Sequence, residues 1–487
     1  MISLCIPFLI ALPSSHQVID FYRQAEITRV NPGRKDVRKV IGDDGRQTTA
    51  ARRILQYTLA EAHSLFIDSH PGVPVCRSRF CYLRPGDVFL ASSQDQEVCS
   101  CPYCDNLNFM LKSAQLGTGR DFLKLCICSE PGELCKRSFC ETCPFSDDSF
   151  LHDKISSSQM EFRFKKWEGG HLVSCTLERD EFFHSLREKL VFFHEHIYLK
   201  EVQAAELREQ KRTLRVGEVI ITADFAENYN CRYREEVMAH HWAQSPPVVI
   251  FTSVVYFRGS EGAEVSSRSY AVVSDVGKNT TIEMCVFMDA ILTHLNNNGV
   301  PYERGVHFWT DGATKHFKNR FVMCYLSRFS DIYGAPSTWN FNESYHGKGA
   351  MDGIGAVLKH TIYMCVLRGQ EVVSNAREFF EACTRRITNV VVIFRSSEEL
   401  EERSPEFLRL YDGAREARGI LRARCVRTLG PYLVQLYRTS KAEEPFSTCT
   451  LTPPAVVNAS SNTLQPTTPP TTPTTPTTPP TPVLISI

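Results

Sequence analysis

Two stretches, Val216–Asp224 (VGEVIITAD) and Val306–Gly312 (VHFWTDG), decide the fold class of this 487-residue chain. Each contains a short apolar run that is typical of a buried β-strand. Each run ends at an aspartate, Asp224 in the first and Asp311 in the second. Both stretches are therefore predicted to be buried strands that carry a carboxylate at the end.

Further strands and helices are predicted around these two stretches. The predicted strands lie at 247–257, 268–274 and 337–342, and the predicted helices at 280–297, 317–329 and 349–367. The order is three strands, helix, strand, helix, strand, helix. In a ribonuclease-H-like fold the first and fourth strands are neighbours, and the last helix lies over their ends. We therefore predict an α/β domain with a ribonuclease-H-like, mixed five-stranded sheet and flanking helices.

Three aspartates lie at element ends that this fold would bring together. Asp224 and Asp311 end the first and fourth strands, and Asp352 lies in the first turn of the last helix. Clustered carboxylates repel one another unless cations neutralise them, and hard oxygen ligands suit Mg²⁺ or Mn²⁺. Two such ions about 3.5–4 Å apart activate a water or a 3′-hydroxyl for phosphodiester chemistry. Turn or helix-capping roles are the ordinary alternative, and Asp275 and Glu227 are substitute ligands.

The motifs around these acids resemble the eukaryotic DDE/D transposase-like proteins of the retroviral-integrase superfamily. They stand here as DFAENY at 224–229, TDGATKHFKN at 310–319 and SYHGKGAMDGIG at 344–355. The resemblance covers residues 20–440 and is strongest over 216–365.

The resemblance implies an enzyme that cuts DNA and transfers strands. Asp224, Asp311 and Asp352 would be its catalytic residues and its Mg²⁺ or Mn²⁺ ligands. Lys359 lies seven residues after Asp352 on the same helical face, and Lys359 and Lys318 are expected to contact DNA. The implied partners are transposon ends and target DNA, with no membrane, and several copies of the chain can assemble. The implied location is the nucleus, with the cytoplasm as the alternative.

The chain departs from the family pattern in three places. The third acid is Asp instead of the commoner Glu, Lys315-His316 stand where a Gln is expected, and Tyr345 separates the Ser from the His. These departures favour a second hypothesis, in which a host protein keeps the fold and binds DNA or another protein without catalysis.

Residues 1–95 are predicted to form a basic N-terminal region. Nine Lys and Arg stand against four acids between Arg23 and Arg53. A helical pattern over 48–68, a loop and a second short element follow, which is typical of a helix-turn-helix that reads DNA or of a solvated helical hairpin. The residues expected to contact DNA are Arg34, Lys35, Arg38, Lys39, Arg52 and Arg53.

Cysteine is concentrated in the next region, 96–176, and ten of the nineteen cysteines lie between Cys76 and Cys143. Such clustering in a long chain favours metal binding over disulfides. Two CxxC pairs can complete a tetrahedral Zn²⁺ site. The predicted structural zinc ligands are Cys101, Cys104, Cys140 and Cys143.

Other ligand combinations remain open in this region. Four further cysteines lie nearby: Cys99, Cys126, Cys128 and Cys135. One of them can replace a member of a CxxC pair, or they can build a second site with His152 or His171. His194 and His196 lie two residues apart on a predicted helix, where side chains diverge, and are not expected to form a metal-binding pair.

Charge, hydropathy and the flanking segments add weaker constraints. The 55 basic and 55 acidic residues balance, so any nucleic-acid surface must be local. No apolar stretch reaches the roughly 18–20 residues of a membrane span, and Met1–Pro13 lacks the basic start of a signal peptide. A secreted, Thr-glycosylated protein is a third hypothesis. The remaining predicted regions are a connecting helix at 177–213, the catalytic domain at 214–370, a mixed α/β extension at 371–450 and a disordered Thr/Pro tail at 451–487.

Overall fold

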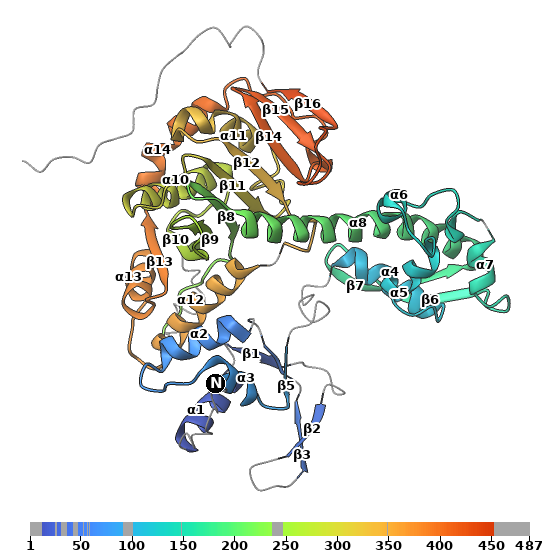
Figure 1. Cartoon of the computed structure of the whole chain (residues 1–487), viewed down its shortest axis with the longest axis horizontal. Coiled ribbons are helices and arrows are strands. Elements are labelled where there is room, and N and C mark those ends of the chain that lie inside the picture. The colour runs from blue at the N-terminus through green and yellow to red at the C-terminus, as the bar shows by residue number, and fades with distance from the viewer. Residues whose placement is uncertain are drawn as a thin grey trace, which may run out of the picture.

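The computed structural model describes residues 12–24, 27–30, 37–41, 47–51, 53–55, 57, 59–90, 101–147, 149–235, 247–347 and 349–451. It consists of an N-terminal module, a Cys-rich module and an α/β domain, and a long helix joins the last two (Figure 1). Apart from Leu451, the predicted Thr/Pro tail lies outside the described residues. Within these ranges, no helix combines the length and apolar character needed to cross a membrane.

The α/β domain is built on a mixed sheet of nine strands in the order β13-β10-β9-β8-β11-β12-β14-β15-β16. β8 pairs antiparallel with β9 and parallel with β11, β9 pairs antiparallel with β10, and β11 pairs parallel with β12. These five central strands lie within three residues of the predicted ones: β8 Glu218–Phe225, β9 Val249–Arg258, β10 Val265–Ser274, β11 Gly305–Thr310 and β12 Ser337–Phe341.

The prediction of a five-stranded sheet is wrong because four strands of the C-terminal segment join the same sheet. β13 (Val390–Arg395) pairs in parallel with β10 at one edge. β14 (Cys425–Gly430), β15 (Leu433–Tyr437) and β16 (Ser447–Thr450) continue antiparallel from β12 at the other edge. Pairing between strands far apart in the chain leaves little trace in local periodicity.

Helices cover both faces of the sheet and enclose two separate apolar clusters. One face carries α10 (Thr281–Asn297), α11 (Arg320–Tyr333) and α14 (Ser397–Leu410). The opposite face carries α12 (Ala350–Leu367) and α13 (Ala376–Arg386). Because the sheet is buried on both faces, its central strands read as continuous apolar runs.

Local signals mark several helix ends in this domain. At the start of α10, the Glu283 carboxylate accepts a hydrogen bond of 2.7 Å from the Thr280 amide and completes a capping box. α11 ends at Gly334, whose φ of 71° is left-handed and costs glycine least. A short 3₁₀ turn, η2 (Ile420–Arg422), precedes β14.

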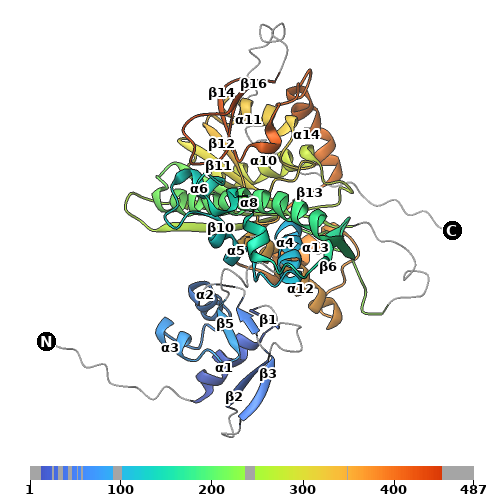
Figure 2. The ribbon, with the colours of Figure 1, turned by 90° about the vertical axis from the view of Figure 1, so that its right-hand side faces the viewer.

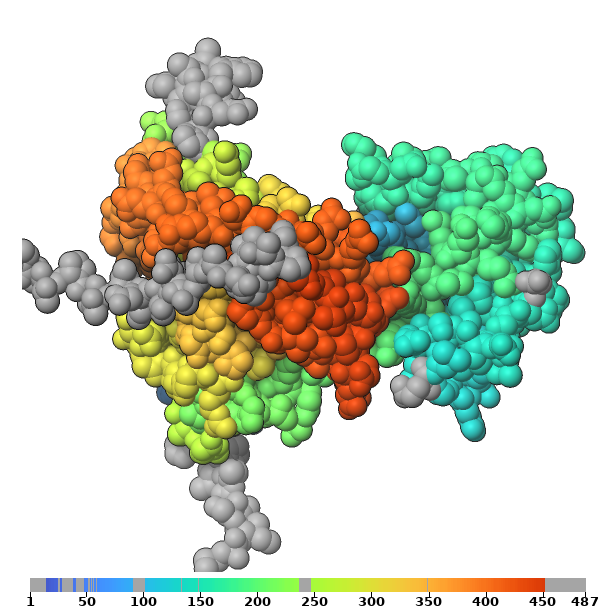
Figure 3. Space-filling view, turned by 90° about the horizontal axis from the view of Figure 1, so that it is seen from above, coloured from blue at the N-terminus to red at the C-terminus, as the bar shows by residue number. Residues whose placement is uncertain are grey.

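The long helix α8 (Arg179–Thr213) has 35 residues and lies within the region 177–213, where a connecting helix is predicted. A helix of this length is about 50 Å long. Its first half carries the Cys-rich module and its second half packs on the α/β domain (Figure 1). The view from the Cys-rich side in Figure 2 shows the Cys-rich module in front of the α/β domain. Seen from above, the Cys-rich module and the α/β domain lie side by side (Figure 3).

The Cys-rich module surrounds the first half of α8. A β-hairpin, β6 (Glu161–Glu168) and β7 (His171–Glu178), leads into the helix. Phe162 of the hairpin stacks on Phe182 of α8 with ring centroids 3.8 Å apart. The shorter helices of the module are α4 Pro102–Ser113, α5 Gly119–Cys126, α6 Glu133–Arg137, η1 Pro144–Ser146 and α7 Phe150–Lys154.

The N-terminal module combines three helices with short strands. Its helices are α1 (Leu12–Arg23), α2 (Leu59–Ser69) and α3 (Arg77–Tyr82). A three-stranded sheet has the order β1-β4-β5, and β2 and β3 form a hairpin. The strand bounds are β1 Thr28–Val30, β2 Val37–Ile41, β3 Gln47–Ala51, β4 Arg53–Leu55 and β5 Val88–Leu90.

The helix predicted over residues 48–68 is wrong in its first half. β3 and β4 occupy this part, and the helix begins only at Leu59. The β-branched Thr48, Thr49 and Ile54 favour strands once pairing partners are present. α2 and α3 do form a helix, loop and helix, but α3 has only six residues, which is short for a recognition helix.

Candidate metal centres and carboxylate site

The structure brings the three predicted aspartates to one end of the central sheet. Asp224 lies near the end of β8 and Asp311 follows β11, and these neighbouring strands are parallel. Asp352 lies in the first turn of α12. α12 packs closely on the strand end, because a Cβ on Gly355 would lie only 2.8 Å from the Cβ of Ala226.

The electrostatics of the aspartates reflect their proximity. Burial, together with the negative charges of Asp311 and Asp352, raises the pKa of Asp224 to about 7. Burial also raises the pKa of Asp311, and the charge of Asp352 adds to this effect, whereas the hydrogen bond from the Ala313 amide opposes it. The charge of Asp352 is therefore close enough to raise the pKa of both Asp224 and Asp311.

Each carboxylate nevertheless accepts a hydrogen bond from a nearby backbone amide. These bonds join Asp224 to Phe225 N at 2.8 Å, Asp311 to Ala313 N at 3.1 Å and Asp352 to Gly349 N at 2.8 Å. Two Cys/His groups in the described chain have ligand atoms that all lie within 4.8 Å of one another, whereas the aspartates form no such group. The aspartates share one end of the sheet without a converged set of oxygens.

The two substitute acids have other roles. The Asp275 carboxylate accepts a hydrogen bond of 2.7 Å from the Ser397 amide at the start of α14. Glu227 pairs with Lys359, at 3.4 Å between Oε2 and Nζ. Both residues therefore have partners outside the aspartate trio.

The two lysines that were expected on DNA differ in exposure. Lys359 is partly exposed and lies beside Glu227, at the same end of the sheet as Asp224. Lys318 is buried, with Nζ 4.9 Å from the centre of the Phe341 ring, and burial lowers its pKa to about 7. The buried Lys318 presents no surface contact for phosphate, so the structure does not fit that prediction.

Four cysteine sulfurs of the Cys-rich module form a compact tetrahedral cluster. All six Sγ–Sγ distances lie between 3.3 and 3.8 Å for the four cysteines Cys128, Cys135, Cys140 and Cys143. Four sulfurs about 2.3 Å from a zinc ion would be about 3.8 Å apart. This four-cysteine cluster could hold a metal ion such as zinc.

The local chain explains how the four-cysteine cluster forms. Cys140 and Cys143 make a tight turn in which Cys143 N donates to Cys140 O at 3.1 Å. The Cys140 amide donates to the Cys143 sulfur at 3.3 Å. Cys135 lies in α6, and the Thr142 hydroxyl and the neighbouring thiols lower the pKa of Cys140 to about 6. Residues 128–143 therefore supply every ligand themselves.

A second cluster combines two cysteines and two histidines. Cys101 and Cys104 start α4, His196 lies in α8, and His346 lies in the loop before α12. The Cys101 sulfur is 3.3 Å from His196 Nε2, and the Cys104 sulfur is 3.7 Å from His346 Nε2. The two Nε2 atoms are 3.0 Å apart. We call this the mixed cluster, and it too could hold a metal ion such as zinc.

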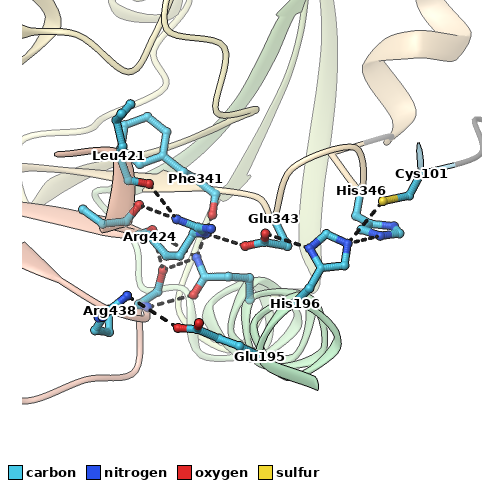
Figure 4. A network of polar contacts seen from close by, with 12 residues as sticks. Cys101, Glu195, His196, Phe341, Glu343, His346, Leu421, Arg424 and Arg438 are labelled. Atoms are coloured by element: carbon cyan, nitrogen blue, oxygen red, sulfur yellow. Dashed lines mark hydrogen bonds and ion pairs between the residues drawn. The ribbon is translucent and has the colours of Figure 1, made fainter. Parts of the chain in front are cut away.

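A buried ion pair supports the mixed cluster from behind (Figure 4). His196 Nδ1 is 2.9 Å from the Glu343 carboxylate, and Arg424 Nε donates to the other oxygen of Glu343. The side chains of His196, Glu343 and Arg424 are 0%, 4% and 11% exposed. A carboxylate on the second ring nitrogen is the usual orienting contact of a histidine that ligates a metal.

The two clusters change the predicted set of zinc ligands. The CxxC pairs do not share one site, because Cys101 and Cys104 belong to the mixed cluster and Cys140 and Cys143 to the other. Of the surplus cysteines, Cys128 and Cys135 belong to the four-cysteine cluster, Cys126 is a buried core thiol, and Cys99 lies outside the described residues.

The histidines in the clusters differ from those that the sequence analysis considered. His152 and His171 are exposed and belong to neither cluster. His194 and His196 do diverge as predicted, but His196 alone joins the mixed cluster. The prediction excluded the pair and so missed that His196 by itself belongs to a group of residues that could hold a metal ion. His346 lies within the SYHGKG motif. The signal in the sequence was the CxxC pair Cys101 and Cys104, which has no second CxxC pair close by and so needs two further ligands from elsewhere in the chain.

The basic residues of the N-terminal module are only partly described. Arg38 and Lys39 are exposed on β2. Arg53 is engaged within the module, because its Nη1 donates to Arg23 O at 3.1 Å and its Nε is 3.9 Å from Asp87. The other three predicted contacts, Arg34, Lys35 and Arg52, lie outside the described residues.

Comparison with known proteins gives two family matches. Residues 203–440 match the model of a domain of unknown function, DUF8701, and residues 12–92 match that of another, DUF8699. The first match includes the three aspartates, His346 and the Glu343–Arg424 pair, and the second spans the N-terminal module. No curated protein and no solved structure matches the chain.

Proposed function

We propose that this chain is a DDE/D-type, transposase-like protein that cleaves DNA and transfers strands with the help of divalent metal ions. The observation that carries the proposal is the arrival of Asp224, Asp311 and Asp352 at one end of a sheet from two parallel strands and a helix. Three mutually repelling acids are costly to a fold unless they bind cations.

The topology of the sheet supports this proposal. The five central strands of the α/β domain lie side by side as β10-β9-β8-β11-β12. If they are numbered 1 to 5 along the chain, this is the order 3-2-1-4-5. β9 runs antiparallel to the other four. This is the strand order expected of a ribonuclease-H-like domain, in which the first and fourth strands lie side by side.

The donor chemistry of the site fits Mg²⁺ or Mn²⁺. Asp224, Asp311 and Asp352 would hold the ions, and carboxylate oxygens are the ligands that these hard cations prefer. Bound ions of this kind activate a water or a 3′-hydroxyl for attack on phosphorus. Each aspartate uses one carboxylate oxygen for a backbone amide, so the second oxygen of each is the one that would turn toward shared ions.

DNA is the proposed partner, and its phosphates would be contacted by exposed cations. Lys359 lies at the aspartate end of the sheet, and Arg38 and Lys39 project from β2 in the N-terminal module. Contacts of this kind position DNA without reading its sequence. A protein with this activity would work in the nucleus.

The test of the proposal is divalent-dependent nicking of supercoiled DNA by the full chain. We expect nicking in Mg²⁺ or Mn²⁺ that falls at least about 100-fold in Asp311→Asn, because the variant loses a metal ligand. Asp275→Asn is the matched control, since Asp275 also ends a strand but contacts Ser397. Equal nicking by wild type and Asp311→Asn would remove the enzyme proposal for this site.

The second candidate is a non-catalytic host protein that keeps the fold and binds DNA or another protein. One observation favours it, namely that the oxygens of the aspartates do not form a converged group. DNA binding by the wild type without any nicking in Mg²⁺ or Mn²⁺ would select this candidate.

A further inference from the structure

We propose that Cys101, Cys104, His196 and His346 bind one zinc ion that anchors the 343–352 segment, and Asp352 at its end, to the Cys-rich module and α8. The zinc site stands on the geometry of the mixed cluster alone. Its importance for catalysis rests on the function proposed above for Asp352.

The donor atoms of the mixed cluster are arranged for a tetrahedral ion. Its measured Sγ–Nε2 and Nε2–Nε2 separations run from 3.0 to 3.7 Å. A zinc ion with two sulfur and two nitrogen ligands requires separations of about 3.3–3.6 Å. Because the Glu343 carboxylate can only accept, Nδ1 of His196 donates to it. The lone pair of His196 Nε2 in the neutral ring is therefore directed into the cluster.

The charges around the mixed cluster balance when a divalent ion is bound. Two thiolates, from Cys101 and Cys104, match the two charges of zinc. The remaining carboxylate, Glu343, is matched by Arg424, whose Nη1 also donates to Leu421 O at 3.1 Å. A buried group of charges is tolerated only when each charge has a partner.

The scaffold behind the mixed cluster is held firmly to the sheet. Gln203 of α8 is 1% exposed, and its Nε2 donates to Phe341 O at 2.9 Å and to Arg424 O at 3.0 Å. Gln203 Oε1 accepts a hydrogen bond of 2.8 Å from the Ser440 amide. Gln203 therefore ties α8 to the end of β12 and to the residue before β14, and the same helix carries His196.

The segment that carries His346 leads directly to the aspartates. His346 N donates to Glu343 O at 2.9 Å, and Tyr345 between them has a left-handed φ of 63°. A Cβ on Gly347 would lie 3.2 Å from the Cβ of Asp311. Gly349 N donates to the Asp352 carboxylate at 2.8 Å. Only five residues separate His346 from Asp352, so fixing one restricts the other.

The strained backbone of this segment requires an anchor. A non-glycine residue in the left-handed region is strained and persists only when the surrounding structure holds it in place. Ligation of His346 and the hydrogen bond to Glu343 hold both sides of Tyr345. Loss of the ion is therefore expected to loosen this segment before the sheet itself.

The first experiment measures zinc in the full-length protein by elemental analysis and native mass spectrometry. We expect two zinc ions in the wild type and one in His346→Ala, with the second ion restored in His346→Cys because a thiolate can replace the imidazole. Cys140→Ser, the matched control from the four-cysteine cluster, also retains one ion. Retention of both ions by His346→Ala, or a single ion in wild type that His346→Ala keeps, would overturn the proposed site.

The second experiment follows amide hydrogen exchange in the 343–352 segment. We expect exchange about tenfold faster in His346→Ala, restored in His346→Cys, and unchanged in Cys140→Ser. Unchanged exchange in a His346→Ala protein that has lost its ion would overturn the anchoring role. Asp311→Asn separates the two proposals, because it is expected to keep both zinc ions and normal exchange whether or not the wild type cleaves DNA.

Discussion

The two Cys/His clusters of this protein differ in how their ligands are distributed along the chain. The four-cysteine cluster closes loops of at most 15 residues within one module, whereas the mixed cluster links histidines 150 residues apart. Closing a loop that is ten times longer removes about 2 kcal/mol more entropy from the unfolded chain. The difference teaches that one cluster shapes a local loop, whereas the other joins two parts of the molecule.

The largest predicted effect comes from a ligand of the mixed cluster. In His196→Ala the ion is lost and Glu343 loses a buried partner, so we expect the free energy of unfolding of the α/β domain to fall by about 3–5 kcal/mol. Cys128→Ala should leave that transition nearly unchanged, because its cluster lies wholly in the Cys-rich module. Urea unfolding followed by circular dichroism makes the measurement. Equal losses of unfolding free energy in His196→Ala and Cys128→Ala would contradict the expected difference between the two clusters.

The next effect sharpens the role of the ion pair behind the mixed cluster. Glu343→Gln leaves Arg424 without its buried partner and should cost about 2–4 kcal/mol, with zinc affinity about 10–100-fold weaker. The control is Arg438→Gln, whose pair with Glu195 is half exposed and should contribute less than about 1 kcal/mol. Zinc competition with a chelator and thermal unfolding give the two values. Similar losses in both variants would show that burial of the pair is unimportant.

A smaller effect concerns the carboxylates, which unlike the clusters have no converged ligand atoms. The pKa of Asp224 in the folded protein is about 7, well above its usual range, so its ionisation opposes folding. Wild-type stability without divalent ions should therefore fall as the pH rises from about 4 to about 7.

Asp224→Asn tests this pH dependence directly. The variant should lack this part of the pH slope and be about 1–3 kcal/mol more stable than wild type at pH 8. Addition of Mg²⁺ should narrow the difference, because the ion stabilises only the carboxylate. Chemical unfolding at several pH values provides the measurement, and a parallel slope in both proteins would contradict the assigned cause.

The smallest effect is expected in the N-terminal module, which contributes no ligand to either cluster. Arg38→Ala combined with Lys39→Ala should weaken DNA binding similarly for all sequences and reduce the salt slope by about 2. The zinc content should stay at the wild-type value. Fluorescence anisotropy at several salt concentrations tests this, and an unchanged slope would place the DNA contacts elsewhere.

Local sequence patterns predicted the centre of the α/β domain well. The runs around Ile220 and Phe308 indicated buried strands, and the helices at α10 and α12 followed from their periodicity. Such patterns arise from the contact of each residue with its near neighbours and with one buried face. The same patterns placed Asp224, Asp311 and Asp352 at the ends of elements, and the CxxC pairs in a region able to bind metal.

The tertiary structure alone decided which partners these elements and ligands find. The sequence could not reveal that β13 and β14 extend the sheet, or that Cys101 and Cys104 are completed by His196 and His346. The periodicity of a strand depends on a few consecutive residues, so it can be recognised in a short stretch of sequence. A metal ion requires four donor atoms within a few ångströms of one point, and that condition is met only after α4, α8 and the loop before α12 have packed together.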